Sequence, residues 1–253
     1  MTTPTHSAIK CILLKQIKYS YNITDAITPL DGRNRDKLNE LVPFFSERAL
    51  NKYRIYVETE YLKALSTHKI IRPFTQREIS YLDQISASFY IKGYKKLRKI
   101  ESITNHDLQA VVVYIQKLLS KSSLKDQNEM VHFGLTSDDI NNLAYGQMVQ
   151  NAVHGALVPE LQKVVENLRD MSSAYKKVYM LGKTHGQSAA PTTFGKELAV
   201  FKSRLSRELQ CLTSLKLHGK CTGNVGNLNA HVFVFPQFDW IRFSKAFVSS
   251  LGF

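Results

Sequence analysis

The stretch TFGKELAVFKSRLSRELQCLTSLKL, residues 193–217, decides the fold of this chain. Its apolar side chains recur at steps of three and four residues, at Phe194, Leu198, Phe201, Leu205, Leu209 and Leu212. An α-helix turns once in about 3.6 residues, so this spacing puts all of them on one side of a helix. A stripe of this width usually faces neighbouring helices, which predicts that the stretch belongs to a helical bundle.

The same periodicity extends over much of the remaining chain. It predicts helices over residues 46–65, 79–89, 107–119, 138–158 and 160–175. Pro159 divides the last two segments and should start or kink a helix there, because proline has no backbone N–H. The run Val111-Val112-Val113 is also compatible with a buried strand, but the polar residues around it favour a helix. Strand alternation with hairpin turns is nearly absent, so the predicted fold class is all-α with long helices.

The composition is that of an ordinary globular protein. Of 253 residues, 43% are hydrophobic and 22% are charged, which excludes a wholly disordered or collagen-like chain. The longest apolar stretches are far shorter than the roughly 20 residues that cross a bilayer, so we expect no membrane span. Cys11, Cys211 and Cys221 are odd in number and lack metal-ligand spacing, which favours a cytoplasmic location and no metal.

The charge balance is strongly basic. Lys+Arg 34 against Asp+Glu 21 give a formal net charge of +13, which suits a partner with phosphates or carboxylates. The basic residues are spread along the chain, and we interpret the short clusters at 92–99 and 202–207 as solvated helix faces. The charge alone does not decide between a small anionic metabolite and a nucleic acid, but the dispersed basic residues and the lack of a recognition motif make nucleic-acid binding the weakest hypothesis.

Polar residues without an obvious structural duty gather in four short segments. These are Asp31-Gly32-Arg33, Thr104-Asn105-His106-Asp107, Thr136-Ser137-Asp138-Asp139 and Thr184-His185-Gly186-Gln187. Thr136 precedes Asp139 by three residues, just ahead of an apolar run, which predicts a capping box at a helix start. A helix start also offers free amides and a partial positive charge to an anion, so a structural cap and a carboxylate site are both open.

Two histidines stand in these segments. His106 can cap the helix that follows it, pack, or donate a hydrogen bond to a phosphate, and an isolated histidine is usually packed or at the surface. His185 lies between Gly182 and Gly186, with Pro191 after it, which predicts a tight irregular loop. Loops on rigid scaffolds are common locations of catalytic groups.

The segment that contains His185 carries a resemblance to a known family. Residues 183–197, KTHGQSAAPTTFGKE, resemble the second signature of the fumarase/aspartase superfamily, in the form found in adenylosuccinate lyases. Four further motifs occur in the same order as in bacterial adenylosuccinate lyases: DGR at 31–33, TNHD at 104–107, HFGLTSDDINN at 132–142 and GKCTGNVGNLNAH at 219–231. The resemblance covers residue 23 to the C-terminus.

This resemblance implies a fold and a reaction. The fold is a small helical N-terminal domain followed by the start of a long-helix bundle domain, for which we predict residues 23–134 and 135–253. Residues 1–22 are interpreted as a basic, disordered extension, with a transit peptide as the alternative. The reaction is the β-elimination of fumarate from adenylosuccinate and from succinylaminoimidazole carboxamide ribotide, without a cofactor. The family forms homotetramers whose active sites collect residues from three chains.

The resemblance also implies the site residues. Arg33 would meet the substrate phosphate, Asn105, His106 and Asp107 would form a substrate-binding turn, and Thr136 and Ser137 would bind the succinyl part. His185 would be the general acid that protonates the departing nitrogen, with Gln187 beside it. The reaction needs an acid and a base on opposite sides, because a carbon loses a proton while a poor nitrogen leaving group gains one.

Two departures from the family pattern matter. Asn34 follows Arg33 where the family has tyrosine, which removes an aromatic hydroxyl from the phosphate end. The third signature, Ser-Ser-x-Met-Pro-x-Lys-x-Asn, which supplies the base serine, is missing before Phe253. We therefore expect a truncated lyase, its N-terminal half, without turnover alone and with open apolar faces at 138–158 and 193–217. The alternative is a non-catalytic product that binds a purine nucleotide or joins a full-length lyase.

Overall fold

The computed structural model describes residues 26–253, and the extension predicted for residues 1–22 lies outside them. The chain divides into two compact units, residues 1–40 and 41–253, which are described separately. The described part of the first unit consists of turns, such as the one closed by the Gly32 N–H on the Thr28 carbonyl at 2.9 Å. It continues into a 3-10 helix, η2 (Arg35–Leu41).

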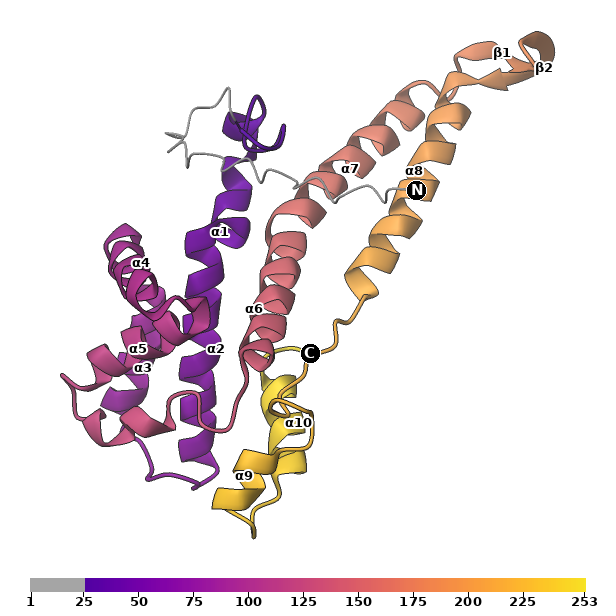
Figure 1. Ribbon diagram of the computed structural model, residues 1–253. Coiled ribbons are helices and arrows are strands. Elements are labelled where there is room, and N and C mark those ends of the chain that lie inside the picture. The colour runs from indigo at the N-terminus through magenta and orange to yellow at the C-terminus, as the bar shows by residue number, and fades with distance from the viewer. Residues whose placement is uncertain (1–25) are drawn as a thin grey trace, which may run out of the picture. The chain divides into compact units, whose positions relative to one another are not determined.

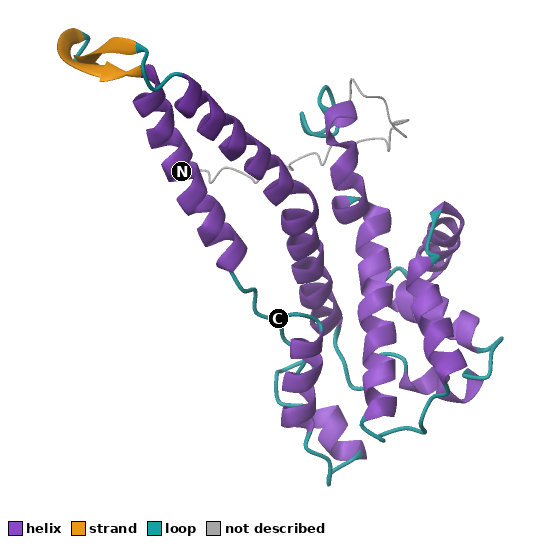
Figure 2. Cartoon of the chain, turned by 180° about the vertical axis from the view of Figure 1, so that it is seen from behind, coloured by secondary structure: helices purple, strands orange, loops and turns teal. Residues whose placement is uncertain are grey.

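The second unit is helical (Figure 1). Its elements are α1 (Val42–Phe45), α2 (Glu47–Thr67), α3 (Gln76–Ala87), α4 (Ile91–Thr104), α5 (Asp107–Leu119), η3 (Lys125–Met130), α6 (Ser137–Ala152), η4 (Val153–Leu157), α7 (Val158–Ala174), β1 (Tyr179–Thr184), β2 (Gln187–Thr193), α8 (Phe194–Ser214), α9 (Asn229–Val234) and α10 (Trp240–Ser250). The all-α prediction is confirmed, and the valine run belongs to α5 rather than to a strand. Within residues 26–253 the only strands are β1 and β2 (Figure 2).

Side-chain caps explain where several helices begin. Ser46 precedes α2, and its hydroxyl accepts from the Ala49 N–H at 3.1 Å. Thr75 and Glu78 form a capping box ahead of α3, and Asp239 begins α10 by accepting from the Arg242 N–H at 2.9 Å. These side chains satisfy N–H groups that the first turn of a helix leaves without a partner.

The core lies around α2, which packs against α3, α5 and α6. Ile55, Leu62 and Leu65 of α2 are buried among apolar residues of those helices. An aromatic cluster from α10 joins this core, where Phe243 and Phe247 lie edge-on to Tyr61 at centroid distances of 5.8 and 5.3 Å. Helices α2 and α6, which contact each other, lie on opposite sides of the domain boundary expected between residues 134 and 135. That boundary stays a prediction.

Helix α6 packs into this core. Its Ile140, Leu143 and Ala144 are fully buried against α2, α1 and the segment that follows α8. The prediction that residues 138–158 leave an apolar face open is therefore wrong for the face of α6 that carries these residues, whereas Tyr145 and Val149 of α6 are 48% and 42% exposed. An apolar face that another part of the same chain covers has the same sequence pattern as one that stays open.

Helices α6 and α7 form one continuous run through η4, a single π turn. In this turn the Val158 N–H donates to the Val153 carbonyl, five residues back instead of four. Pro159, the second residue of α7, has no N–H to donate, and the wider turn directly before it accommodates the missing bond. The change that we predicted at Pro159 is thus a change of helix type within a continuous run.

The hairpin β1–β2 connects α7 to α8, which pack against each other in antiparallel fashion (Figure 1). The strands pair from Tyr179 with Thr193 to Thr184 with Gln187. His185 and Gly186 form the two-residue turn, both at positive φ (52° and 75°), as mirror-image hairpin turns require. Sequence analysis predicted an irregular loop here. Both strands are exposed over most of their length and lack the alternation that marks a half-buried strand.

Candidate active site

The first candidate segment, Asn105-His106-Asp107, is a sharp turn between α4 and α5. Asn105 ends α4 in the left-handed region, at φ 50°, and His106 begins α5 by accepting the Gln109 N–H on its Nδ1 at 3.2 Å. A neutral His106 then carries its proton on Nε2, where it can donate to a ligand. The side chains of His106 and Asp107 are about half exposed, so both groups are presented at the surface.

Arg54 of α2 joins this turn to α6. Its side chain is buried, its Nη2 donates to Asp107 Oδ2 at 2.6 Å, and its Nε donates to Asn141 Oδ1 at 2.9 Å. Burial raises the pKa of Asp107, but the Leu108 N–H and the Arg54 charge outweigh it, and the pKa is lowered. Asp107 therefore stays ionised and paired at neutral pH.

The second candidate segment, Thr136-Ser137, begins α6, and the predicted capping box with Asp139 is present. Asp139 is fully buried, and its carboxylate accepts four hydrogen bonds. The donors are the N–H groups of Thr136, Thr222 and Gly223, each at 3.0 Å, and Lys220 Nζ at 3.1 Å. This carboxylate fixes the glycine-rich segment after α8 against the start of α6.

Two histidines support the loop that precedes Thr136. His132 Nδ1 lies 2.6 Å from Glu58 Oε1; burial lowers the pKa of His132, but the bond and charge of Glu58 outweigh it and raise the pKa. The Tyr61 hydroxyl donates to the Phe133 carbonyl at 3.0 Å, so Nε2 of the buried His231, 3.0 Å from the hydroxyl oxygen, is the donor in that pair. Burial lowers the pKa of His231. A Cβ on Gly134 would lie 2.6 Å from the His231 ring, so glycine is required there.

The third candidate segment lies at the opposite end of the long helical run. His185 forms the turn of the β1–β2 hairpin with Gln187 directly after it, and both side chains are exposed. The run from Ser137 to Ala174 is roughly 55 Å long at 1.5 Å per residue. Within one chain, Arg54 therefore links Asp107 to Asn141 of α6, and the helical run keeps His185 and Gln187 far from Thr136 and Ser137.

Arg33, expected at the substrate phosphate, belongs to the first unit, where it is exposed in the turn ahead of η2. Asn34, the departure from the family pattern, donates its N–H to the Pro29 carbonyl at 3.1 Å. This bond uses only the backbone, so it does not depend on which side chain stands at position 34.

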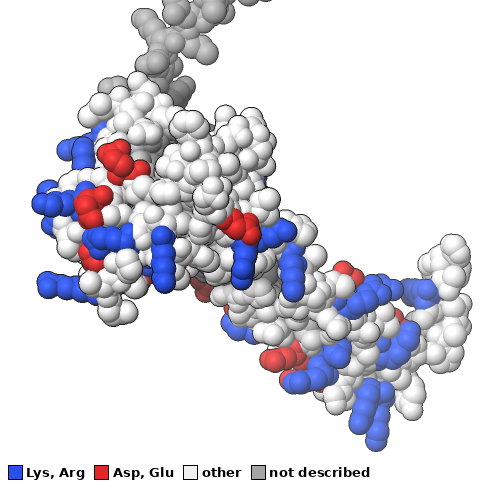
Figure 3. All heavy atoms as spheres, turned by 90° about the horizontal axis from the view of Figure 1, so that it is seen from below, with Lys and Arg blue, Asp and Glu red and all other residues white. Residues whose placement is uncertain are grey.

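On one face of the molecule the charge is mixed rather than concentrated. Figure 3 shows Lys and Arg side chains spread over the visible face with Asp and Glu between them. Among residues 26–253, no group of His, Cys, Asp and Glu is placed to hold a metal ion. In the same residues, no helix combines the length and the apolar character that crossing a membrane requires.

A family model described as "Lyase" matches residues 32–249, which is most of the chain. The chain belongs to this lyase family. The lyase chain is 38% identical to "Adenylosuccinate lyase" of Escherichia coli (strain K12) over 231 residues, covering 90% of this chain and 51% of that protein. For the protein of the same name from Haemophilus influenzae the identity is 40%, again over 90% and 51%. The resemblance noted from the motifs is thus confirmed, and the chain spans about half the length of the curated relatives it matches.

Two solved structures share the fold of this lyase chain. One is a fumarate lyase from Mesorhizobium sp. BNC1, with a TM-score of 0.68, 20% identity, and coverage of 85% of this chain and 48% of that chain. The other is β-carboxy-cis,cis-muconate cycloisomerase from Acinetobacter calcoaceticus sp. ADP1, with a TM-score of 0.67, 21% identity, and coverage of 84% and 48%. Identities this low show a common fold and nothing about substrate.

Sequence analysis did not single out Arg54 or Glu58 of this lyase chain. A signal for both was present in the apolar stripe of α2. Arg54 lies four residues after Leu50, and Glu58 lies three residues before Tyr61. Charged residues are almost never fully buried unless they are paired. Charges at core positions of an amphipathic helix therefore indicate buried ion pairs.

Proposed function

We propose that this chain forms one half of an adenylosuccinate lyase, which eliminates fumarate from adenylosuccinate and from succinylaminoimidazole carboxamide ribotide. The observation that carries the proposal is the joining of Asn105–Asp107 to the start of α6 through Arg54, in a chain 38–40% identical to adenylosuccinate lyases. A helix N-terminus with the hydroxyls of Thr136 and Ser137 beside it suits a carboxylate of the succinyl group. In this proposal the imidazole of His106 supplies a further donor to the substrate.

In the proposed reaction a proton leaves the carbon next to the C–N bond, a C=C bond forms, and the electron pair of the C–N bond leaves with the nitrogen. His185 protonates that nitrogen, and imidazole suits this step because its ordinary pKa lies near neutral pH. Gln187 lies in the same pocket, and Arg33 binds the substrate phosphate. We assign the base to the part of the relatives that this chain does not span.

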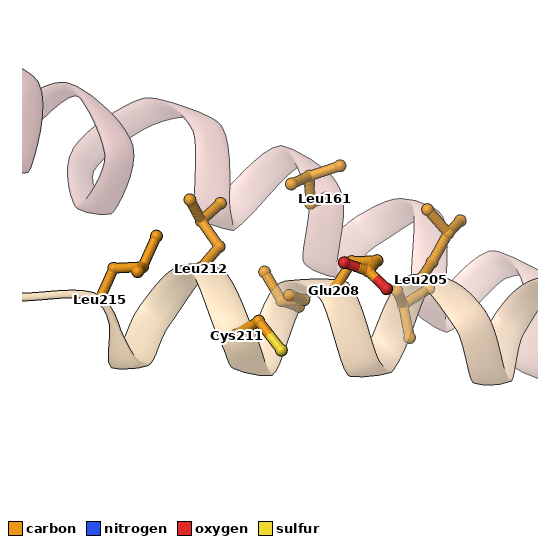
Figure 4. A pocket seen from close by; sticks show the side chains of 8 residues that line it. Leu161, Leu205, Glu208, Cys211, Leu212 and Leu215 are labelled. Atoms are coloured by element: carbon orange, nitrogen blue, oxygen red, sulfur yellow. The ribbon is translucent and has the colours of Figure 1, made fainter.

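His185 reaches the site from another copy of the chain in this proposal, because roughly 55 Å of helix separate it from Thr136 within one copy. The homotetramer implied by the resemblance supplies such copies. Exposed apolar side chains support association: Tyr179 is 83% exposed and Phe201 is 59% exposed. A groove of about 350 Å³ lies between α7 and α8 and is lined largely by leucines. These include Leu161 and Leu212 (Figure 4).

Domains and location complete the proposal. Residues 23–134 are the N-terminal domain, residues 135–253 are the first part of the bundle, and the protein acts in the cytoplasm. A second candidate function is non-catalytic: the chain binds a purine nucleotide or joins a full-length lyase. It is favoured by the long helical run from Ser137 to Ala174, which keeps His185 far from Thr136 within one chain.

Reconstitution separates the two candidates. The chain is fused to, or co-expressed with, the half of the Escherichia coli relative that it does not span, assembly is verified by size-exclusion chromatography, and adenylosuccinate absorbance is followed. We expect turnover only when both halves are present, because one acid–base group contributes roughly 10²- to 10⁴-fold. Robust fumarate release by the chain alone contradicts the assignment of the base, and an assembled protein without turnover favours the non-catalytic function.

A further inference from the structure

We propose that Arg54 is a positioning residue of the substrate site, which holds the Asn105–Asp107 turn and the start of α6 at a fixed separation. The inference rests on the proposed function, and it adds a residue that acts through Asp107 and Asn141 without touching the substrate.

The guanidinium of Arg54 is held rigidly. Its side chain is only 5% exposed, and it bonds to three different side chains. Besides Asp107 and Asn141, it donates from Nη1 to Asn51 Oδ1 at 3.4 Å. Asn51 is itself buried, and its Nδ2 donates to the Glu47 carbonyl at 3.0 Å, which ties it to the first turn of α2. Because the guanidinium is planar and its N–H directions are fixed, it sets the distance between Asp107 and Asn141 and their relative orientation.

Both acceptors belong to segments that carry candidate binding residues. Asp107 follows His106 directly, and the His106 Nδ1 lies 3.5 Å from Asp107 Oδ1. Asn141 lies four residues after Ser137, which places the two side chains on the same face of α6. A shift of either acceptor would therefore move a binding group with it.

Backbone packing does not replace this link. Helices α5 and α6 each pack on α2 and have few contacts with each other. A cavity of about 480 Å³ also opens beside Arg54, lined mostly by polar and aromatic residues that include Tyr94, Arg98 and Tyr145. Because this space is not filled by apolar side chains, the polar bonds of Arg54 fix the relation between the two helix starts.

Arg72 provides a matched control. It joins α3 to η3 with bonds to Glu78 Oε1 at 2.8 Å and to Asp126 Oδ2 at 2.7 Å. Arg72 thus also connects two elements through two carboxylates, but neither element carries a candidate site residue. Arg54→Lys, Arg54→Met and Arg72→Met together separate positioning of the site from general stabilisation.

The first measurement is hydrogen exchange by mass spectrometry on the full chain. We expect Arg54→Met to speed exchange in peptides that cover residues 106–110 and 136–142 together. Arg72→Met should instead speed exchange around residues 76–80 and 125–130. If Arg54→Met leaves residues 106–110 and 136–142 as protected as in the wild type, the proposal is overturned.

The second measurement is steady-state kinetics on the reconstituted lyase, at a temperature where all variants are folded. We expect Arg54→Lys to lose kcat/KM by about 10²-fold, the effect of a misplacement near 1 Å, because one ammonium cannot meet Asp107 and Asn141 in the geometry of the fork. The kcat/KM of Arg72→Met should stay within about twofold of the wild-type value, because Arg72 holds no candidate site residue in place. Wild-type kinetics for Arg54→Lys would overturn the positioning role. If the assembled wild type has no turnover, the proposed function fails, and the exchange result alone decides the role of Arg54.

Discussion

The region around α2 and the arm formed by α7, β1, β2 and α8 belong to one unit but are built differently. Around α2, large side chains such as Tyr61, Leu65 and Trp240 are almost completely buried. In the arm, the described helices bury only Val158 of α7 and Gly195 of α8. The first region is stabilised by its own core, whereas the other helices of residues 26–253 leave the apolar stripes of the arm largely exposed.

The charged groups differ in the same way. Around α2, Arg54, Glu58 and Asp139 are buried and bonded to specific partners. In the arm, ion pairs such as Lys163 with Glu160 and Arg207 with Glu208 are exposed. Exposed pairs contribute little to stability, typically about 0–1 kcal/mol. Substitutions around α2 should therefore affect folding, and substitutions in the arm should affect assembly or chemistry.

The largest effect that sharpens this comparison is expected for His185→Ala in the reconstituted lyase. The side chain is exposed at the hairpin turn, so thermal unfolding of the chain should be unchanged. Turnover should fall roughly 10²- to 10⁴-fold, because protonation of the nitrogen matters only as the C–N bond breaks. Steady-state titration with adenylosuccinate measures this loss of turnover.

Arg33→Ala should instead chiefly raise KM, because a bond to the phosphate stabilises the ground state and the transition state alike. Near-normal turnover of His185→Ala, or an unchanged KM for Arg33→Ala, contradicts these roles.

The opposite behaviour is expected for Asp139→Asn around α2. The amide nitrogen cannot accept a hydrogen bond, so buried N–H groups that the carboxylate accepts would lose their acceptor, and the free energy of unfolding should fall by about 1–3 kcal/mol. Urea unfolding followed by circular dichroism measures the loss. Asp138→Asn is the matched control, because Asp138 is exposed and lies 3.3 Å from the same Lys220 Nζ, and it should cost about 0–1 kcal/mol. Equal losses in the two variants would remove the distinction between buried and exposed pairs.

Association should depend on the arm. We expect the chain alone to form oligomers in light scattering at micromolar concentration, because exposed apolar patches drive association. Phe201→Ser in α8 should shift the distribution toward smaller species while unfolding changes by no more than about 0.5 kcal/mol. Phe233→Ser in α9 is the control, an exposed phenylalanine outside the arm that should leave association unchanged. A stable wild-type monomer would contradict the prediction that the exposed apolar side chains of the arm drive association.

The smallest effect is a pH dependence that arises around α2. Because the pKa of His132 is raised, its pairing with Glu58 contributes fully below the ordinary histidine pKa of about 6.5 and is lost as the pH rises through the raised value. The pKa of His231 is lowered, so its contribution is present above about pH 6.5 and is lost as the pH falls. Urea unfolding at several pH values should show that the free energy of unfolding declines above pH 6.5. In Glu58→Gln this decline should be smaller. If the free energy of unfolding declines equally in Glu58→Gln, groups other than the His132–Glu58 pair cause the decline.

The helices were predictable because their apolar spacing is a local property of the chain. The burial of α6 was not, since its Leu143 is covered by α2 and by a segment that follows α8. The candidate site segments were predicted from motifs, but their relative placement depends on bonds between residues far apart in the sequence. Arg54 is 53 positions from Asp107 and 87 from Asn141, and no local pattern records such a pairing.

The π turn η4 changes the rotational phase of the long helical run. Leu143 and Leu161 are about five turns apart at 3.6 residues per turn, so in an uninterrupted α-helix they would face the same direction. The wider turn between them adds roughly one residue, which corresponds to a rotation of about 100°. Leu143 accordingly faces the core around α2, and Leu161 faces α8. One continuous helical run can thus pack against α2 with one side of α6 and against α8 with a different side of α7, because the π turn between them rotates the apolar side.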